Sequence, residues 1–306
     1  MKNTNINYTY PNTSSIPQRG GLKSRYLKLN KINKELGAPV FQIVEIPADF
    51  IKNVNEERRT GLSVASFLDE KSVPNLYSKD LISDNVNYIL HTEPVFNRKG
   101  INGNKTSKLH WYSSSWFENF VKHVFSIIDF FEVTPYAIEI HPGQSERKKN
   151  NIKAFSAAIE RLHDVYLNKY DRNLLLFIEN RTTQYIQNGT DIKQFWSHFS
   201  NKYPDLIEKT GIVLDIQQLY TATKKRNKNF ENEFSKIPQE CLIGAHVHER
   251  HKKPKCKYIP SEIWNYVAEN QDWSNQQRVF HILPEVHPHS HIIPTFKFCK
   301  SILNLY

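Results

Sequence analysis

The stretch Tyr136-Ala-Ile-Glu-Ile-His-Pro-Gly143 runs from apolar, β-favouring residues into a histidine and then directly into a Pro-Gly turn. This order is typical of a buried strand that presents one side chain at its end before the chain turns away. Five more apolar runs also end in His, Asp or Glu, and they cover residues 87–91, 174–179, 211–215, 242–246 and 279–285. We interpret all these runs as parallel strands whose carboxyl ends point at one shared site.

The remainder of the chain alternates between strand and helix signals. Two further strands are expected at residues 6–10 and 41–46, and helices at 22–35, 58–69, 113–131, 150–170, 191–199, 262–269 and 295–305. Eight strands alternating with helices predict an α/β fold, a single (β/α)8 TIM barrel. The alternative is a doubly wound open sheet, which usually carries a Gly-rich phosphate loop, and neither GxGxxG nor GxxxxGK(S/T) occurs. No repeat or interdomain linker is visible, so we expect one barrel domain over residues 1–306.

The chain is basic, with 41 Lys and Arg residues against 31 Asp and Glu and a formal charge of +10. This excess favours polyanionic partners such as nucleic acid, although a generally Lys/Asn-rich proteome explains it equally well. Three cysteines without CxxC spacing indicate a reducing compartment rather than a disulfide framework. The polar N-terminal residues do not resemble a signal peptide, and no window is long enough to span a membrane. We therefore expect a cytoplasmic protein without a membrane partner.

The polar residues at the strand ends form a set with metal-binding chemistry. Imidazole and carboxylate ligands suit Zn, Mn or Fe. Three histidines and three carboxylates exceed what one ion needs, so they predict two divalent ions that share a bridging carboxylate. Taken singly, each has a structural explanation: Asp215 can cap a helix, and Glu179 can pair with Arg181. The metal prediction depends on the joint set, namely His91, His141, Glu179, Asp215, His246 and Glu285.

Other polar residues lie close to this set in the sequence. His248 lies on the same strand face as His246, and His251 follows it closely. His287, His289 and His291 alternate beyond Glu285, and we expect His289 and His291 to be solvated. Basic residues are expected either to bind a nucleic-acid backbone or to form ordinary solvated surface, and they are Lys148, Lys149, Lys224, Lys225 and Arg226.

These motifs resemble the xylose-isomerase-like TIM barrels, and within them the endonuclease IV (apurinic/apyrimidinic endonuclease) family. The resemblance covers most of the chain. It is carried by Gly20-Gly21-Leu22, the stretch 37–44, Tyr88-Ile-Leu-His91, Ile140-His141-Pro-Gly143, Phe177-Ile-Glu-Asn180, Gly211-Ile-Val-Leu-Asp215, His246 and Glu285. It implies that Glu179 bridges two zinc ions. The family uses a third zinc, but its Asp-x-x-His motif here reads Asp215-Ile-Gln-Gln218. The nearest further candidates for a third site are His248, Glu249 and His251.

The resemblance implies a metal-dependent hydrolase that cleaves phosphodiesters in DNA, as in DNA repair, with Glu179 and Glu285 as catalytic residues. A sugar isomerase or epimerase is the alternative. In such an enzyme Glu179, Asp215, His246 and Glu285 hold one divalent ion, and the two glutamates move a proton on a small ketose. Two further possibilities are a multi-iron oxidative enzyme and a non-catalytic, metal-stabilised binding protein.

Overall fold

The computed structural model describes residues 6–12, 21–48, 73–75, 77–78, 86–92, 109–144, 151–270 and 278–303. The helix predicted at 58–69 and the predicted DNA-binding residues Lys148 and Lys149 lie outside these ranges. None of the described helices is long and apolar enough to cross a membrane.

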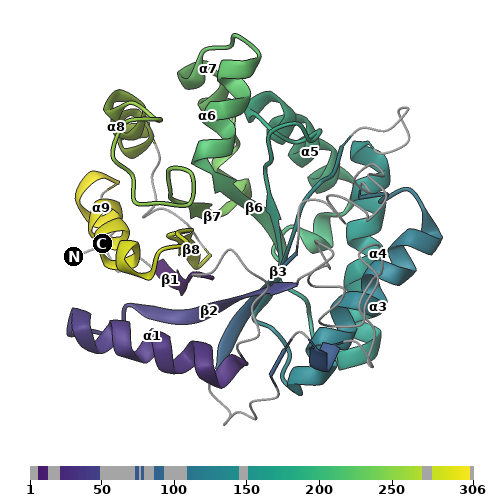
Figure 1. Cartoon of the computed structure of the whole chain (residues 1–306). Coiled ribbons are helices and arrows are strands. Elements are labelled where there is room, and N and C mark those ends of the chain that lie inside the picture. Colours follow the sequence, from purple (N-terminus) through teal and green to yellow (C-terminus); the bar gives the residue numbers. More distant parts are fainter. Residues whose placement is uncertain are drawn as a thin grey trace, which may run out of the picture.

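Eight parallel strands close into a barrel, in which each strand pairs with the next and β8 pairs with β1 (Figure 1). The strands are β1 (Ile6–Tyr10), β2 (Phe41–Ala48), β3 (Asn87–Thr92), β4 (Ala137–Ile140), β5 (Leu176–Glu179), β6 (Thr210–Asp215), β7 (Leu242–His246) and β8 (Phe280–Leu283). The predicted (β/α)8 barrel is therefore confirmed, and the open-sheet alternative is excluded.

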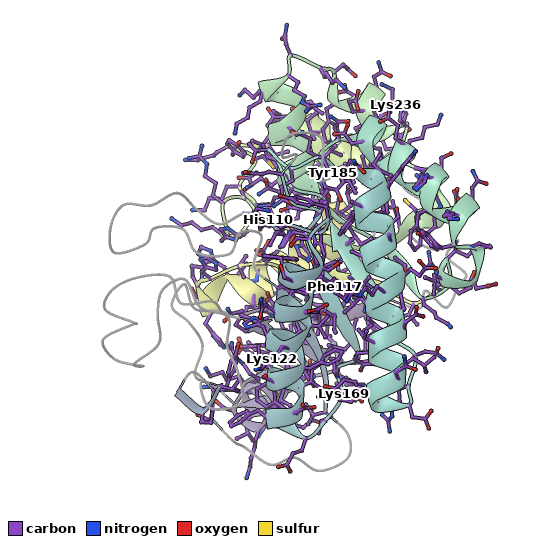
Figure 2. The ribbon with its side chains drawn as sticks, turned by 90° about the vertical axis from the view of Figure 1, so that its right-hand side faces the viewer. His110, Phe117, Lys122, Lys169, Tyr185 and Lys236 are labelled. Carbon is purple, nitrogen blue, oxygen red and sulfur yellow. The ribbon has the colours of Figure 1, made fainter. Side chains whose placement is uncertain are left out.

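Helices surround the barrel on its outer side (Figure 1). They are α1 (Leu22–Leu36), α3 (Ser114–Phe131), α4 (Ile152–Tyr170), α5 (Gly189–Lys202), α6 (Ile216–Lys225), α7 (Phe230–Phe234), α8 (Ser261–Asn270) and α9 (Ile292–Ile302), with short 3-10 turns η1 (Val73–Asn75), η2 (Pro204–Leu206), η3 (Gln239–Cys241) and η4 (His289–His291). Aromatic and ion-pair contacts hold neighbouring helices together. Figure 2 shows α3, with Phe117 and Lys122 labelled, and α4, with Lys169 labelled. Arg161 of α4 lies over the ring of Phe117, and Lys169 pairs with Asp129 of α3.

The sequence did not predict α6 and α7, and three of the basic residues expected to bind nucleic acid lie at the end of α6. Lys224 and Lys225 form the last turn of α6 and Arg226 caps it, rather than starting a helix or lying in a loop. Since α6 has 10 residues, this turn lies roughly 15 Å along the helix from Asp215, where α6 begins. Nη1 of Arg226 lies 3.9 Å from Oδ2 of Asp191 in α5. These three residues are therefore remote from the strand ends.

The barrel interior is layered because every second residue of a strand points inward. One inward layer is apolar and consists of Ile43, Ile89, Ala137, Phe177, Val213 and Ile243. Two residues further along each of five strands, the next inward layer is polar: Glu45, His91, Glu139, Glu179 and Asp215. In β7 the register shifts at Ile243, which brings His246 level with Asp215. The apolar layer thus forms the floor of a polar site.

Candidate metal centre

All six predicted ligands come together at the carboxyl end of the barrel. Glu179, Asp215 and His246 are the last residues of β5, β6 and β7. His91 is the penultimate residue of β3, and His141 follows β4 directly. Glu285 lies two positions beyond the end of β8. This is the end at which (β/α)8 barrels carry their active sites.

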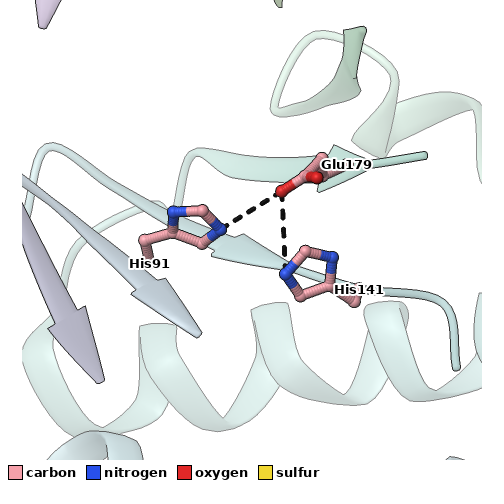
Figure 3. Close-up of side chains that lie close together, drawn as sticks. All are labelled: His91, His141 and Glu179. Atoms are coloured by element: carbon pink, nitrogen blue, oxygen red, sulfur yellow. Dashed lines mark ion pairs between the residues drawn. The ribbon is translucent and has the colours of Figure 1, made fainter. Parts of the chain in front are cut away.

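Glu179 is the centre of this arrangement. Its Oε2 atom lies 3.2 Å from Nε2 of His91 and 3.6 Å from Nε2 of His141. Figure 3 shows both rings converging on this one oxygen. The same oxygen lies 3.7 Å from Nδ1 of His246. Glu179 is therefore shared between a group on β3 and β4 and a group on the later strands.

The second group contains His246 and the two remaining carboxylates. Nδ1 of His246 lies 3.5 Å from Oε2 of Glu285. Asp215, His246 and Glu285 each offer one ligand atom, and these atoms lie within 4.8 Å of one another, as do those of His91, His141 and Glu179. Each group is thus compact enough to hold one cation.

Several buried polar atoms in these groups have no hydrogen-bond partner among the described residues. They are both ring nitrogens of His141, Nδ1 of His246, Oε2 of Glu179 and Oε2 of Glu285. Burying such atoms without a partner is costly, and each unpaired group requires an explanation. A divalent ion held between imidazole nitrogens and carboxylate oxygens would satisfy them. The donor atoms therefore fit zinc, manganese or iron.

The charge at the site also requires cations. Five buried or nearly buried carboxylates surround it, Glu45, Glu139, Glu179, Asp215 and Glu285, and one guanidinium, Arg181, lies beside them. Burial lowers the pKa values of His91 and His246, but Glu139 and the other carboxylates outweigh it and raise both well above the ordinary value. Burial, together with the positive charges nearby, holds the pKa of His141 well below its usual range. The metal-free chain thus compensates by protonating histidines, while His141 stays neutral and able to bind an ion.

Sequence reasoning missed two carboxylates of the site. Oε1 of Glu45 lies 2.8 Å from Nδ1 of His91, and Oε1 of Glu139 lies 3.1 Å from Nε2 of His246. In both rings, the opposite nitrogen faces Glu179. A signal for Glu139 was available, because it precedes His141 by two positions and period-two alternation points both inward.

Asp215 both caps a helix and lies among the candidate metal ligands. Its Oδ1 accepts a hydrogen bond from the backbone N–H of Gln218 at 2.9 Å and so caps α6. Its Oδ2 lies 3.4 Å from Nε2 of His248. Gln218 does not face the centre with a ligand atom of its own: its amide oxygen accepts from the N–H of Thr182 at 3.2 Å.

The other third-site candidates divide into two kinds. Glu249 is directed into its own loop, where its carboxylate accepts the N–H groups of Lys255 at 3.1 Å and Cys256 at 3.0 Å. His248 and His251 instead flank Glu285, at 2.9 Å and 3.2 Å from its oxygens. The rings of His251 and His287 lie parallel, with centroids 4.3 Å apart. Of these candidates, Glu249 is used within its own loop, whereas His248 and His251 both contact Glu285.

The histidines beyond Glu285 behave differently from one another. His289 is exposed, as the sequence reading expects. His291 is half-buried, and its Nδ1 accepts a hydrogen bond from the N–H of Lys253 at 3.1 Å. The expectation of a solvated His291 is therefore wrong, because this ring holds the β7–α8 loop.

No protein-family model matches the sequence, and no curated protein matches it either. Solved structures do share its fold. A xylose isomerase domain protein from Alicyclobacillus acidocaldarius aligns with a TM-score of 0.52 at 13% identity, over 98% of each chain. The IolI protein, solved with a bound zinc atom, aligns with a TM-score of 0.55 at 10% identity, over 98% of this chain and 99% of that one. The chain therefore has the fold of the xylose-isomerase-like TIM barrels.

Proposed function

We propose that this protein is a divalent-metal-dependent phosphodiesterase that cleaves DNA, akin to the endonuclease IV branch, with two ions at the centre. One observation carries the proposal: Oε2 of Glu179 lies between two separate ligand groups. His91 and His141 would hold one ion with Glu179, and Asp215, His246 and Glu285 would hold the other. A carboxylate shared in this way is the arrangement that a two-ion site needs.

A pair of divalent ions would lower the pKa of a water molecule and stabilise the leaving oxygen of an in-line displacement. The residues around this pair of ions would have distinct tasks. Glu179 is fully buried and holds both halves of the centre together. Glu285 has a side chain that is 14% exposed, more than any other carboxylate of the set, so it is the ligand that an entering substrate would meet. Burial raises the pKa of Glu285, but His248 and His251 outweigh it and hold the value well below the usual range, so this carboxylate stays ionised and suited to an ion.

Two ions, rather than three, agree with the contacts made by the remaining candidates. The amide of Gln218 and the carboxylate of Glu249 are both occupied by backbone N–H groups of loops. His248, His251 and Glu285 offer ligand atoms within 4.8 Å of one another, so the proposal of two ions rests on the groups around Glu179 and not on an absence of further donors. The net charge of +10 supports DNA as the substrate, because a basic protein gains affinity for polyanions by releasing condensed counterions.

A sugar isomerase remains the second candidate because of one specific arrangement. Oε2 of Glu179 and Oε2 of Glu285 approach the same atom, Nδ1 of His246, at 3.7 Å and 3.5 Å. Two carboxylates around one ligand position can move a proton on a ketose bound to a single ion. In that enzyme His91 and His141 would be structural.

The deciding experiment combines metal content with turnover in the full chain and in His141→Gln. We expect about two zinc ions in the wild type, and cleavage of abasic or nicked DNA that falls steeply as salt rises. His141→Gln should keep one ion and lose the cleavage. His198→Gln, which changes a histidine on α5 away from the strand ends, is the matched control and should change neither.

Other results would support the competing functions. Conversion of a ketose that is indifferent to salt and survives in His141→Gln would establish the isomerase instead. Tight metal and DNA binding without turnover of either substrate would establish a binding protein. Bound iron would direct attention to oxidative chemistry, and a chain that binds none of these metals would exclude all of the enzymatic functions above.

A further inference from the structure

Arg181 places a permanent positive charge at the edge of the candidate metal centre. It follows Glu179 by two positions, in the first turn after β5. Its Nη1 donates a hydrogen bond to Oε1 of Glu179 at 3.4 Å, the oxygen that the histidines do not face. The side chain of Arg181 is 21% exposed, whereas that of Glu179 is fully buried. The guanidinium thus lies between the centre and solvent.

The loop that carries Arg181 is held firmly. The N–H of Arg181 donates to the carbonyl of Ile186 at 3.0 Å, and its carbonyl accepts from the N–H of Gln184 at 3.0 Å. The neighbouring Thr182 is bonded twice to Gln218 of α6, through its N–H at 3.2 Å and its hydroxyl at 2.9 Å. Because both backbone groups of Arg181 are bonded, the backbone at Arg181 is held in place, and the bond to Glu179 directs the guanidinium toward the centre.

Most donors of this guanidinium are unused. A guanidinium has five N–H donors in a rigid fork that matches carboxylates and phosphates with two parallel hydrogen bonds. Within the described part of the chain, the single long contact with Glu179 is the one side-chain hydrogen bond that Arg181 makes. An arginine that served only to neutralise Glu179 would be expected to use its fork on both oxygens. The remaining donors have no partner among the described residues, and the side chain is 21% exposed, so a ligand can reach them.

Bound ions would change the charge that surrounds Arg181. Three ligand carboxylates, Glu179, Asp215 and Glu285, do not neutralise two divalent ions, and Arg181 adds another positive charge. Glu45 and Glu139 bring the buried carboxylates around the centre to five, so a site with two divalent ions would be close to neutral overall. Arg181 is partly exposed at its edge, so an entering anion would meet this positive charge.

We propose that Arg181 binds a non-bridging oxygen of a phosphoryl group and so selects phosphate esters over neutral sugars. This inference rests on the two-ion site of the proposed function and adds the substrate group that the site recognises. A planar, always-charged donor beside a metal centre suits a phosphoryl group, which has oxygens for both partners at once. A neutral ketose offers no charge for it.

The test measures binding of inorganic phosphate to the zinc-loaded full chain by calorimetry. Arg181→Gln should weaken phosphate binding by about 10- to 100-fold, which is typical of losing a charge-assisted hydrogen bond, without changing the number of zinc ions. Arg181→Lys keeps the charge without the fork and should give an intermediate loss. Arg172→Gln is the matched control: Arg172 is exposed, bonds Thr134 and lies before β5. It should bind phosphate as the wild type does.

Several outcomes separate this inference from the proposed function. Unchanged phosphate affinity in Arg181→Gln with full zinc content would overturn the role of Arg181. If Arg181→Gln loses zinc, Arg181→Lys becomes the deciding variant. Wild-type phosphate affinity together with wild-type zinc content in Arg181→Lys would also overturn the role of Arg181. A loss for acetate but not for phosphate would assign Arg181 to carboxylates and reject the phosphoryl group. A phosphate loss in a chain that cleaves no phosphodiester would support Arg181 and overturn the proposed reaction.

Discussion

Oε1 of Glu45 lies 2.8 Å from Nδ1 of His91, and the opposite nitrogen of the same ring lies 3.2 Å from Oε2 of Glu179. Glu45 is itself fixed, because its Oε2 accepts the N–H of Asn12 at 2.6 Å. A carboxylate in this position sets which ring nitrogen is protonated and how the ring is oriented toward an ion. We therefore expect Glu45, a residue of β2, to position His91 toward an ion.

Replacing Glu45 by Gln should weaken zinc binding by about 10- to 100-fold, the range found when the carboxylate partner of a ligand histidine is removed. The loss should affect the ion held by His91 and His141, because the ring of His91 would lose its fixed orientation. Competition with a chelating dye measures it. Glu118→Gln, on the exposed face of α3, is the control and should leave zinc affinity unchanged. Equal affinity in Glu45→Gln would show that packing alone orients His91.

Replacing Glu139 by Gln should affect the other ion. Oε1 of Glu139 lies 3.1 Å from Nε2 of His246, so the change removes the charged partner of that ring. We expect a loss of affinity of similar size at the ion held with Asp215 and Glu285. A two-step zinc titration distinguishes the ions: Glu45→Gln and Glu139→Gln should weaken different steps. If both variants weaken the same step, the division into two ligand groups is wrong.

The ligands that end their strands could be predicted from sequence because each is the polar residue at the end of an apolar run. Glu45 and Glu139 lie inside apolar runs, and only the inward alternation of a closed barrel distinguishes them from outward-facing neighbours. The helix α6 starts directly at Asp215 without a loop, so the same residue ends a strand and caps a helix. The position of His251 depends on a turn in which it has a φ of 54°, a left-handed conformation that is uncommon for histidine. Local sequence patterns do not encode such a turn.

Replacing Glu179 by Gln should abolish cleavage while the fold is kept. The two side chains have nearly the same shape, but the amide is a poor metal ligand and lacks the charge that two ions share. Zinc content should fall, and the far-UV circular dichroism spectrum should match that of the wild type. His198→Gln again serves as the control. Full activity in Glu179→Gln would rule out a two-ion reaction centred on this residue.

A carboxylate outside the site tests the packing of α5 against α7. Glu233 accepts hydrogen bonds from the N–H of Thr190 at 2.9 Å and from Lys228 and Lys236, each at 2.9 Å. Burial raises the pKa of Glu233, but these donors outweigh it and lower the value to about 2. A depressed pKa gives stability that is present above the unfolded value, near 4.5, and is lost as pH falls toward 2.

Glu233→Gln should therefore lower the free energy of unfolding at pH 7 by about 1–3 kcal/mol, and the difference from the wild type should shrink below pH 4. Urea unfolding at several pH values measures this. The control is Glu118→Gln, which breaks an exposed pair with Arg161 and should cost less than about 1 kcal/mol. Equal losses in the two variants would mean that the Glu233 cluster behaves as ordinary surface.

Zinc affinity should rise with pH because the histidines must lose their protons to bind. In the metal-free chain, burial lowers the pKa of His248, but Glu285 and Asp215 raise it to about 10. The pKa values of His91 and His246 are also raised.

Raised pKa values stabilise the metal-free fold fully below the unfolded pKa of histidine, about 6.5, and this stability is lost as pH rises toward 10. The melting temperature of the metal-free chain should thus fall between pH 6 and 9, while the apparent zinc affinity increases and binding releases protons. Calorimetry in two buffers with different ionisation enthalpies counts these protons. Zinc binding without proton release would mean that the carboxylates, rather than the protonated histidines, adjust the charge of the empty site.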